Sequence, residues 1–276
     1  MPSARDFGIF IDLQQLQLGL LLGGLLVFVL LETFVPDARA MFPVRLRGGG
    51  RNLAVFALGT LATSVVLGTF YFYCAAFLAV NRVGLLYIVP VPAWLGFVLG
   101  FLAIDFSDYL FHRISHDRKW LWVMHAVHHS DPRLDVTTHF RAHPGHMLIS
   151  VGWRILIIAA TGVPFWLALL HDVLVIPFAE WQHANVPVAA RLDRWLRAVI
   201  VTPGMHRIHH SPLPEETDSN FGGLLTLWDR LLGTYRSAKL PSETRYGLRQ
   251  LAAQRFQNLW GLLLTPARAW SLTGRL

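Results

Sequence analysis

Four long apolar stretches limit what this chain can fold into. They cover residues 13–35, 53–80, 92–111 and 147–179. A helix that spans a bilayer needs about 20 apolar residues, and the first three stretches are each long enough to be one. The fourth is broken near its middle by Gly162 and Pro164, which favours a hairpin of two half-depth or tilted helices. The sequence therefore predicts an all-α integral membrane protein with about four or five transmembrane or hairpin helices.

The composition favours the same class. Hydrophobic residues make up 54% of the chain and charged residues 15%, and the mean hydropathy is +0.44, which is too apolar for most soluble domains. The net charge of +7 comes largely from arginine, since lysine occurs only at Lys119 and Lys239. The arginines lie beside apolar runs, so we expect contact with anionic lipid headgroups and no nucleic-acid partner. Cys74 is the only cysteine, which excludes a disulfide framework within the chain.

The distribution of basic residues predicts the topology. Residues 36–52 contain four arginines and three consecutive glycines, and we interpret them as a loop. The positive-inside rule places such a loop in the cytoplasm, with the N-terminus across the membrane. Counting spans from there puts residues 112–146 and 180–276 in a cytoplasmic cap and tail. No low-complexity linker divides the chain, so we expect a single domain over residues 1–276.

The last part of the chain, residues 239–276, interleaves apolar and basic residues. This pattern is typical of an amphipathic helix. Such a tail can lie on the membrane surface or pack against the cap, and the sequence leaves both alternatives open.

Histidines in the predicted cap recur at helical spacings. Residues at i, i+3 and i+4 share one face of an α-helix, so a set with this spacing can converge on a metal ion. There are three such sets: His112 and His116; His125, His128 and His129; and His206, His209 and His210. Closed structural zinc sites are four-coordinate and would use too few of these imidazoles. Eight or nine are enough for two metal ions with open positions, although imidazole suits iron, zinc and copper alike.

Other polar residues of these segments require a separate interpretation. Asp105 and Asp108 share a helical face with His112. We expect them to accept hydrogen bonds from metal-binding histidines and to fix their tautomers, with pairing to a buried arginine as the alternative. We interpret three further histidines as satisfied core residues: His139, His146 and His171.

The motifs resemble those of a known superfamily. His-Arg-x-x-His, His-x-x-His-His and a later His-x-x-His-His precede Asp-Ser-Asn-Phe-Gly and Leu-Trp-Asp-Arg-Leu-Leu-Gly-Thr-Tyr. From about Asp105 to Tyr235 the chain resembles the fatty acid hydroxylase/sterol desaturase superfamily. The resemblance implies a membrane-embedded, dioxygen-dependent oxygenase whose three histidine sets hold two iron ions, with zinc as a substitute in purified protein. It also implies that His183 is a ligand. His143 matches a family position without an assigned role, and His139 matches none.

The resemblance further implies hydroxylation of a membrane lipid (a fatty acyl chain, sterol, carotenoid or ether lipid), with desaturation at the same site as the alternative. Breaking an unactivated C–H bond needs dioxygen and two electrons. Because the chain contains no fused cytochrome domain, we expect a separate reductase or small electron-transfer protein. Further candidates for polar groups near the metals are Glu180 and Asn185. The oligomeric state is left open.

Two functions of another class remain as alternatives. A haem-carrying electron-transfer protein pairs single histidines on facing helices, and a metal transporter lines a pore through the bilayer midplane with ionisable residues. Here the histidines occur as doublets and collect at one end of the predicted spans. This placement disfavours both alternatives.

Overall fold

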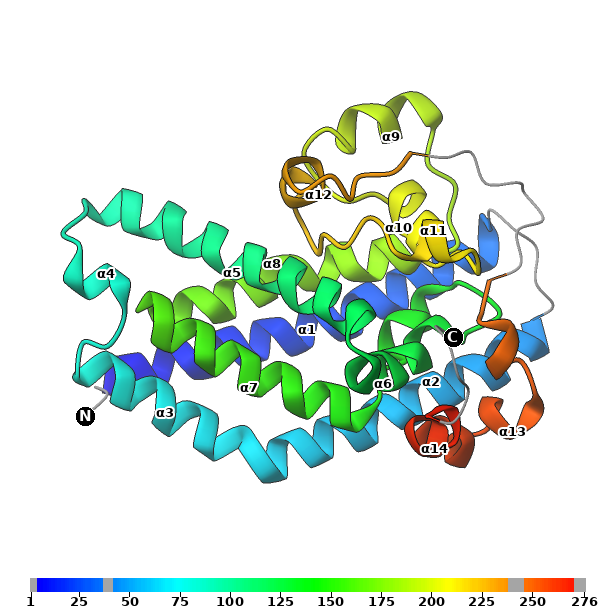
Figure 1. The fold of residues 1–276 in the computed structure, drawn as a ribbon, viewed down its shortest axis with the longest axis horizontal. Helices are drawn as coiled ribbons and strands as arrows, with labels where there is room; N and C mark the ends of the chain where they lie inside the picture. Colours follow the sequence, from blue (N-terminus) through cyan, green and yellow to red (C-terminus); the bar gives the residue numbers. More distant parts are fainter. Residues whose placement is uncertain (1–3, 37–41, 238–245, 271–276) are drawn as a thin grey trace.

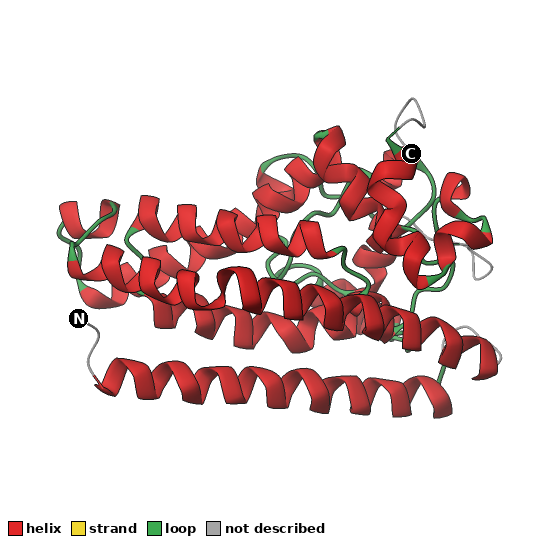
Figure 2. Ribbon diagram, turned by 90° about the horizontal axis from the view of Figure 1, so that it is seen from below, coloured by secondary structure: helices red, strands yellow, loops and turns green. Residues whose placement is uncertain are grey.

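The computed structural model describes residues 4–36, 42–237 and 246–270. Long helices run side by side along the long axis of the molecule, and most of the short helices lie toward one end (Figure 1). The long helices are α1 (Ala4–Phe34), α2 (Phe42–Thr63), α3 (Thr69–Val80), α5 (Ala93–Asp117), α7 (Pro144–Thr161) and α8 (Phe165–His183). No β-strand is named in the described residues, as the colouring of Figure 2 makes clear.

Four segments of this bundle are long and apolar enough to cross a membrane. They are Ile11–Phe34, Leu46–Ile88, Ala93–Asp117 and Pro144–Thr161. Their outer surfaces carry exposed side chains such as Leu26, Leu61 and Trp94. Side chains of this kind are stable when exposed to lipid and not to water. The predicted class, an all-α integral membrane protein, is confirmed.

The helix termini show at which end of the bundle each connection of the chain lies. α1 begins at the end of the bundle opposite most of the short helices, and the turn after α3 and the short helix α4 (Leu85–Ile88) lie at the same end (Figure 1). The beginning of α2 lies at the other end, together with most of the short helices. This arrangement agrees with the predicted alternation of sides, whereas the assignment of the histidine end to the cytoplasm stays a prediction.

The predicted loop over residues 36–52 is wrong from Phe42 onward. α2 begins there and continues through the three glycines to Thr63, and the π-helical turn Ser64–Gly68 joins it to α3. The glycines let α2 approach neighbouring residues closely, and they do not interrupt the helix. A Cβ on Gly48 would overlap the guanidinium of Arg133, and one on Gly49 would lie 3.1 Å from the Thr137 side chain. Glycine therefore lets the helix pass against residues 133–137.

The third span and the hairpin follow the sequence pattern. α5 begins directly after Pro92, a position where proline is compatible with a helix start, and it continues to Asp117. α7 ends at Gly162, whose φ of +73° is left-handed and suits glycine. Pro164 then precedes α8. The predicted break inside residues 147–179 is therefore present.

The C-terminal segment packs against the cap. Its elements are η3 (Arg249–Leu251), α13 (Gln254–Gln257) and α14 (Leu259–Ala269). Leu251 and Phe256 are buried against Val123 and Ala126 of α6 (Lys119–His129). Of the two sequence-based alternatives for the tail, packing against the cap is the one seen for these residues. The remaining short elements are α4 (Leu85–Ile88), η2 (Val136–Phe140), α9 (Ala190–Leu196), α10 (Pro203–His209), α11 (Pro214–Thr217) and α12 (Leu227–Leu231).

Candidate metal centre

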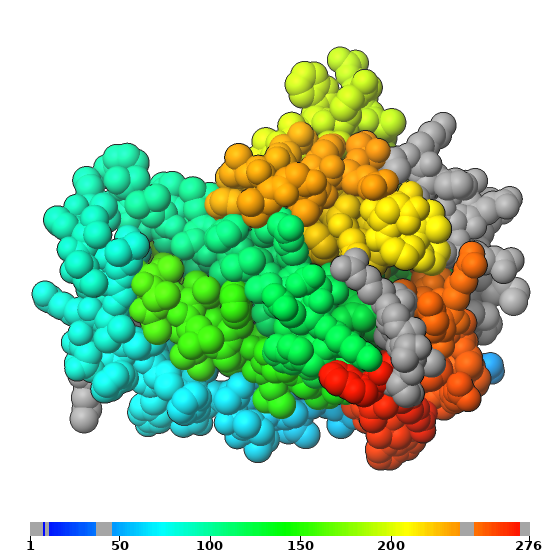
Figure 3. Space-filling model, in the orientation of Figure 1, coloured from blue at the N-terminus to red at the C-terminus, as the bar shows by residue number. Residues whose placement is uncertain are grey.

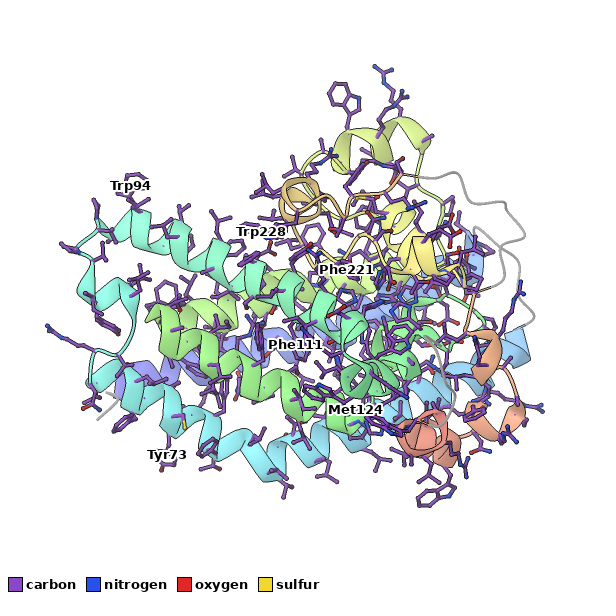
Figure 4. All side chains as sticks on the ribbon, in the orientation of Figure 1. Tyr73, Trp94, Phe111, Met124, Phe221 and Trp228 are labelled. Carbon is purple, nitrogen blue, oxygen red and sulfur yellow. The ribbon has the colours of Figure 1, made fainter. Side chains whose placement is uncertain are left out.

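The histidines that the sequence analysis selected come from four helices that meet at one end of the bundle. α5 contributes two, α6 three, α8 one, and α10 with the residue after it three. In Figure 4 this region lies beside the labelled Phe221, where α5, α6 and α10 converge. The nine side chains divide into two groups: His112, His116, His125, His129 and His209 form the first group, and His128, His183, His206 and His210 form the second.

In the first group, five ring nitrogens converge. One nitrogen from each ring lies within 4.8 Å of the others. The Nε2 atom of every one of the five rings is buried and has no hydrogen-bond partner among the described residues. A buried polar atom without a partner is unfavourable, and five together are exceptional. A cation at their centre would satisfy all five.

In the second group, the ring nitrogens face one another. His206 Nε2 is 2.9 Å from His183 Nε2, which is 3.1 Å from His128 Nε2, and His210 Nε2 is 3.1 Å from His206 Nε2. Two nitrogens that bind one ion at about 2.1 Å are about 3.0–3.4 Å apart when the N–ion–N angle lies between a right angle and the tetrahedral angle. The spacing fits four ligands around a single ion.

The outer ring nitrogens fix the tautomer of three of the histidines. His112 Nδ1 is 2.9 Å from the Phe221 carbonyl, His209 Nδ1 is 2.8 Å from the Ser219 carbonyl, and His183 Nδ1 is 2.7 Å from the Ala179 carbonyl. A carbonyl only accepts, so each Nδ1 carries the proton and donates. The Nε2 lone pair of each ring is then left free and directed into its group, as metal ligation requires.

The electrostatic environment keeps these rings neutral. Burial lowers the pKa of His128, His129 and His210 well below the ordinary histidine value, and neighbouring imidazoles lower it further. Burial lowers the pKa of His183 to about 3. Neutral imidazole is the form that binds a metal ion, so at pH 7 the centre is already in its binding state.

The two groups are direct neighbours. His128 and His129 are adjacent in sequence but belong to different groups, and the same is true of His209 and His210. The rings of His129 and His210 lie 4.6 Å apart between centroids. Each of these two His-His doublets therefore contributes to both groups, so ions held by the two groups would lie side by side.

Asp105 and Asp108 do not have the role expected for them. Asp105 accepts from Trp228 Nε1 at 2.6 Å and lies 3.4 Å from His171 Nε2, and Asp108 pairs with Arg154 at 3.0 Å. Within the described residues neither carboxylate hydrogen-bonds to a histidine of the two groups, so the expected fixing of ligand tautomers by these carboxylates is wrong. The physical reason is depth, because Asp105 and Asp108 lie two turns and one turn before His112 on α5, level with polar residues of α7 and α8.

Loop 218–222 supplies partners that the sequence analysis did not assign. Asp218 Oδ1 lies 3.4 Å from His116 Nδ1, and the loop carries two of the carbonyls that hold histidine rings. The loop is itself held by Asp229 of α12, whose carboxylate accepts from the backbone N–H of Phe221 and Gly222 at 2.8 and 2.9 Å. The Asp-Ser-Asn-Phe-Gly motif marks this loop in the sequence. A motif alone does not show that the backbone carbonyls of the loop hold histidine rings.

The other candidates lie around the centre without joining it. His143 Nε2 is 3.1 Å from the Leu263 carbonyl, and its Nδ1 accepts from the backbone N–H of Gly145, so it connects the start of α7 to α14. Glu180 is fully buried against Gly24 of α1, and its oxygens have no partner among the described residues. Asn185 donates its backbone N–H to Glu32 at 2.7 Å.

The three histidines set aside as core residues stay outside both groups. His146 Nε2 is 3.0 Å from Ser115 Oγ, and its ring stacks on that of His125. His139 lies 5.7 Å from the His183 ring between centroids. His171 is fully buried beside Asp105.

A cavity of about 380 Å³ connects the surface to the first group. It lies between the end of α5 and loop 218–222, and His116 and Phe221 form part of its wall. Polar and apolar side chains both line it: Leu110, Arg113, Ile114, His116, Asp117, Asp218, Phe221 and Thr234.

Fold and site together define an integral membrane protein with two adjacent histidine groups suited to metal ions. The family model for fatty acid hydroxylase matches residues 97–234, which is half of the chain and includes all nine histidines. The chain belongs to this family.

Relatives of known name are lipid-modifying enzymes. Ornithine lipid hydroxylase OlsE of Rhizobium tropici is 32% identical over 179 residues, covering 64% of this chain and 51% of that protein. Alkylglycerol monooxygenase of Xenopus tropicalis is 31% identical and that of Homo sapiens 29%, each covering 54% of this chain and 32% of the relative. The chain thus spans about half or less of the length of these relatives. No solved structure matches it.

Proposed function

We propose that this protein is a dioxygen- and reductant-dependent hydroxylase of a membrane lipid, with two iron ions held by the nine histidines. The observation that carries the proposal is the arrangement of two adjacent groups of neutral imidazoles whose Nε2 atoms point inward. The names of the relatives support hydroxylation of lipids as the reaction class.

The first group of five histidines would hold one ion and the second group of four the other. Iron bound at these ligands supplies the redox chemistry with dioxygen that can break an unactivated C–H bond. Histidine-only ligation leaves the ions fully cationic, since imidazole is a neutral ligand. A separate reductase or small electron-transfer protein is required as the source of electrons.

The protein contributes the geometry of the ligands. Backbone carbonyls of Ala179, Ser219 and Phe221 orient three of the rings before any ion binds. This preorganisation lowers the cost of assembling the ligands. The centre lies at one end of the spans, so a lipid can approach it laterally from the bilayer. The substrate is therefore a membrane lipid, with fatty acyl, sterol, carotenoid and ether lipids as the classes to test.

Labelled dioxygen tests the reaction. Purified protein with iron alone should be inactive, and adding a reductase system and ¹⁸O₂ should place one labelled oxygen atom in a new hydroxyl group of a lipid. A new double bond without label would identify a desaturase with the same centre. Turnover without dioxygen, supported by zinc, would indicate a hydrolase that uses metal-bound water and would refute the proposal.

A further inference from the structure

A pair of short helices projects from one side of the bundle. α9 and α12 lie beside α5 and α8, away from the C-terminal helices, and α9 protrudes from the body of the molecule (Figures 1 and 3). The two are joined by hydrogen bonds, because the backbone N–H of Thr226 donates to the Val199 carbonyl at 3.0 Å and the guanidinium of Arg230 donates to the Arg197 carbonyl at 2.9 Å. We call residues 190–199 and 227–232 the shelf.

The shelf is attached to a membrane-spanning helix well inside its length. Trp228 of α12 donates its Nε1–H to Asp105 of α5 at 2.6 Å, and its ring lies 4.9 Å from that of Phe106 (Figure 4). With a rise of 1.5 Å per residue, Asp105 lies about 18 Å from either end of α5. A hydrocarbon core about 30 Å thick that begins near Ala93 would extend past this level. The attachment point at Asp105 therefore lies at a level that the hydrocarbon core includes, so the shelf borders the membrane.

The surface of the shelf is apolar where it has no protein partner. Trp195 is 71% exposed, Leu231 67% and Val199 63%, and Leu192 is also more than half exposed. Large apolar side chains gathered at this exposure in water would be unfavourable. Three exposed arginines accompany them: Arg191, Arg194 and Arg230. Tryptophan and leucine beside arginine are typical of surfaces that insert into the lipid interface.

We propose that the shelf is an interfacial anchor that embeds in the leaflet on the histidine side, with its arginines against anionic lipid phosphates. Two observations favour a bilayer over a second copy of the chain or a soluble partner. The shelf packs on α5, a membrane-spanning helix that exposes Trp94 and Val98 nearer its start, and the cationic residues of the shelf complement anionic headgroups.

The anchor is connected to the metal centre through α12. Asp229, between the membrane-facing Leu227 and Leu231, holds the backbone of Phe221 and Gly222. The carbonyl of Phe221 in turn holds His112. Contact with the leaflet thereby stabilises the loop that orients ligands of the first group.

Spin-label accessibility in nanodiscs tests the anchor without requiring activity. In a Cys74→Ser background, single labels are placed at W195C and L231C, with E215C as an exposed control off the shelf and V98C as a control on the span. Collision rates with oxygen and with a water-soluble nickel complex are then compared. At positions 195 and 231 the nickel rate should be several-fold lower than at 215, and the oxygen rate should approach that at 98.

Each other result overturns the anchor. Nickel rates at 195 and 231 equal to that at 215 would show a shelf in water. Low rates for both reagents would show a protein contact, with a second copy or a partner as the occupant.

The arginines are tested by repeating the measurement in anionic and in zwitterionic discs. Anionic lipid should lower the nickel rate further, and the Arg191→Gln/Arg194→Gln variant should lose this dependence. Equal rates in both lipids would overturn the assignment of the arginines.

Discussion

The structure contains two buried polar regions with histidine, and they are built in opposite ways. In the middle of the bundle His171 lies 3.4 Å from Asp105, 3.7 Å from Asp108 and 3.8 Å from Asp172, and Arg154 pairs with the last two at 3.0 Å. At the end of the bundle nine histidines face one another, with Asp218 as the carboxylate at hydrogen-bond distance from one of them.

The difference lies in where the compensating charge comes from. In the mid-bundle region Arg154 lies beside the carboxylates of Asp108 and Asp172, so the compensating cation comes from the chain itself. The imidazoles of the end region are neutral and direct lone pairs inward, so a cation from outside completes it. His171 thus has charged partners within the chain, whereas the inward-facing imidazoles of the two groups fit a metal site.

The largest effect is expected from removing one ligand from either group. His209→Ala removes an Nε2 from the first group and His128→Ala one from the second. Each variant should lose bound metal and activity together, because no other side chain can occupy the vacated position. Metal per chain and product formation are the measurements. His139→Ala is the matched control, since His139 lies beside His183 without belonging to a group, and it should be nearly silent. Full metal occupancy after His128→Ala would contradict the comparison.

Breaking the mid-bundle region should affect stability and not metal binding. Arg154→Met leaves Asp108 and Asp172 without their shared cation, and loss of one partner of a buried ion pair costs about 3 kcal/mol or more. The thermal midpoint in nanodiscs should fall, while the folded variant keeps its full metal content. Arg154→Lys, which retains the charge, should lose less. Metal loss from folded Arg154→Met protein would show that the two regions are not separate.

A smaller effect is expected where a carboxylate approaches the metal centre. Asp218→Asn weakens the acceptor at His116 Nδ1. Loss of an outer hydrogen-bond partner lowers metal affinity by about tenfold in comparable sites. Chelator competition should show weaker binding at one of two ions and no change at the other. Asp117→Asn is the control, because Asp117 lines the same cavity but pairs with Arg118. Equal weakening at both ions would argue against a local role for Asp218.

The smallest effect concerns Glu180, a buried carboxyl that belongs to neither region. Burial raises the pKa of Glu180 to about 8 from an ordinary value of 4.5. The folded protein therefore binds a proton that the unfolded chain has lost, so stability should fall as pH rises from about 4.5 through 8. Glu180→Gln cannot ionise, and its thermal midpoint should fall less over that range by a few degrees. Identical pH profiles for the variant and the wild type would show that Glu180 is charged in the fold.

Features that depend on neighbouring residues in the sequence were predictable. The apolar stretches predicted the spans, and Gly162 with Pro164 predicted the break in the hairpin, because hydropathy and backbone preference are local properties. The spacing of each histidine set gave one helical face per set for the same reason. The prediction of a loop at the three glycines was wrong because glycine also permits close contact between a helix and its neighbours. Only the positions of Arg133 and Thr137 opposite these glycines show that contact.

Tertiary structure decided which residues became partners. The sequence placed Asp105 on the face of His112, yet its partners come from α8 and α12. It grouped His128 with His129, yet contacts with α8 and α10 assigned the two to different groups. Helical spacing fixes the direction of a side chain, but the atoms that it meets belong to segments distant in sequence. The sequence by itself therefore determined a membrane bundle with histidines at one end, and only the packing of α5, α6, α8 and α10 determined their division into two groups.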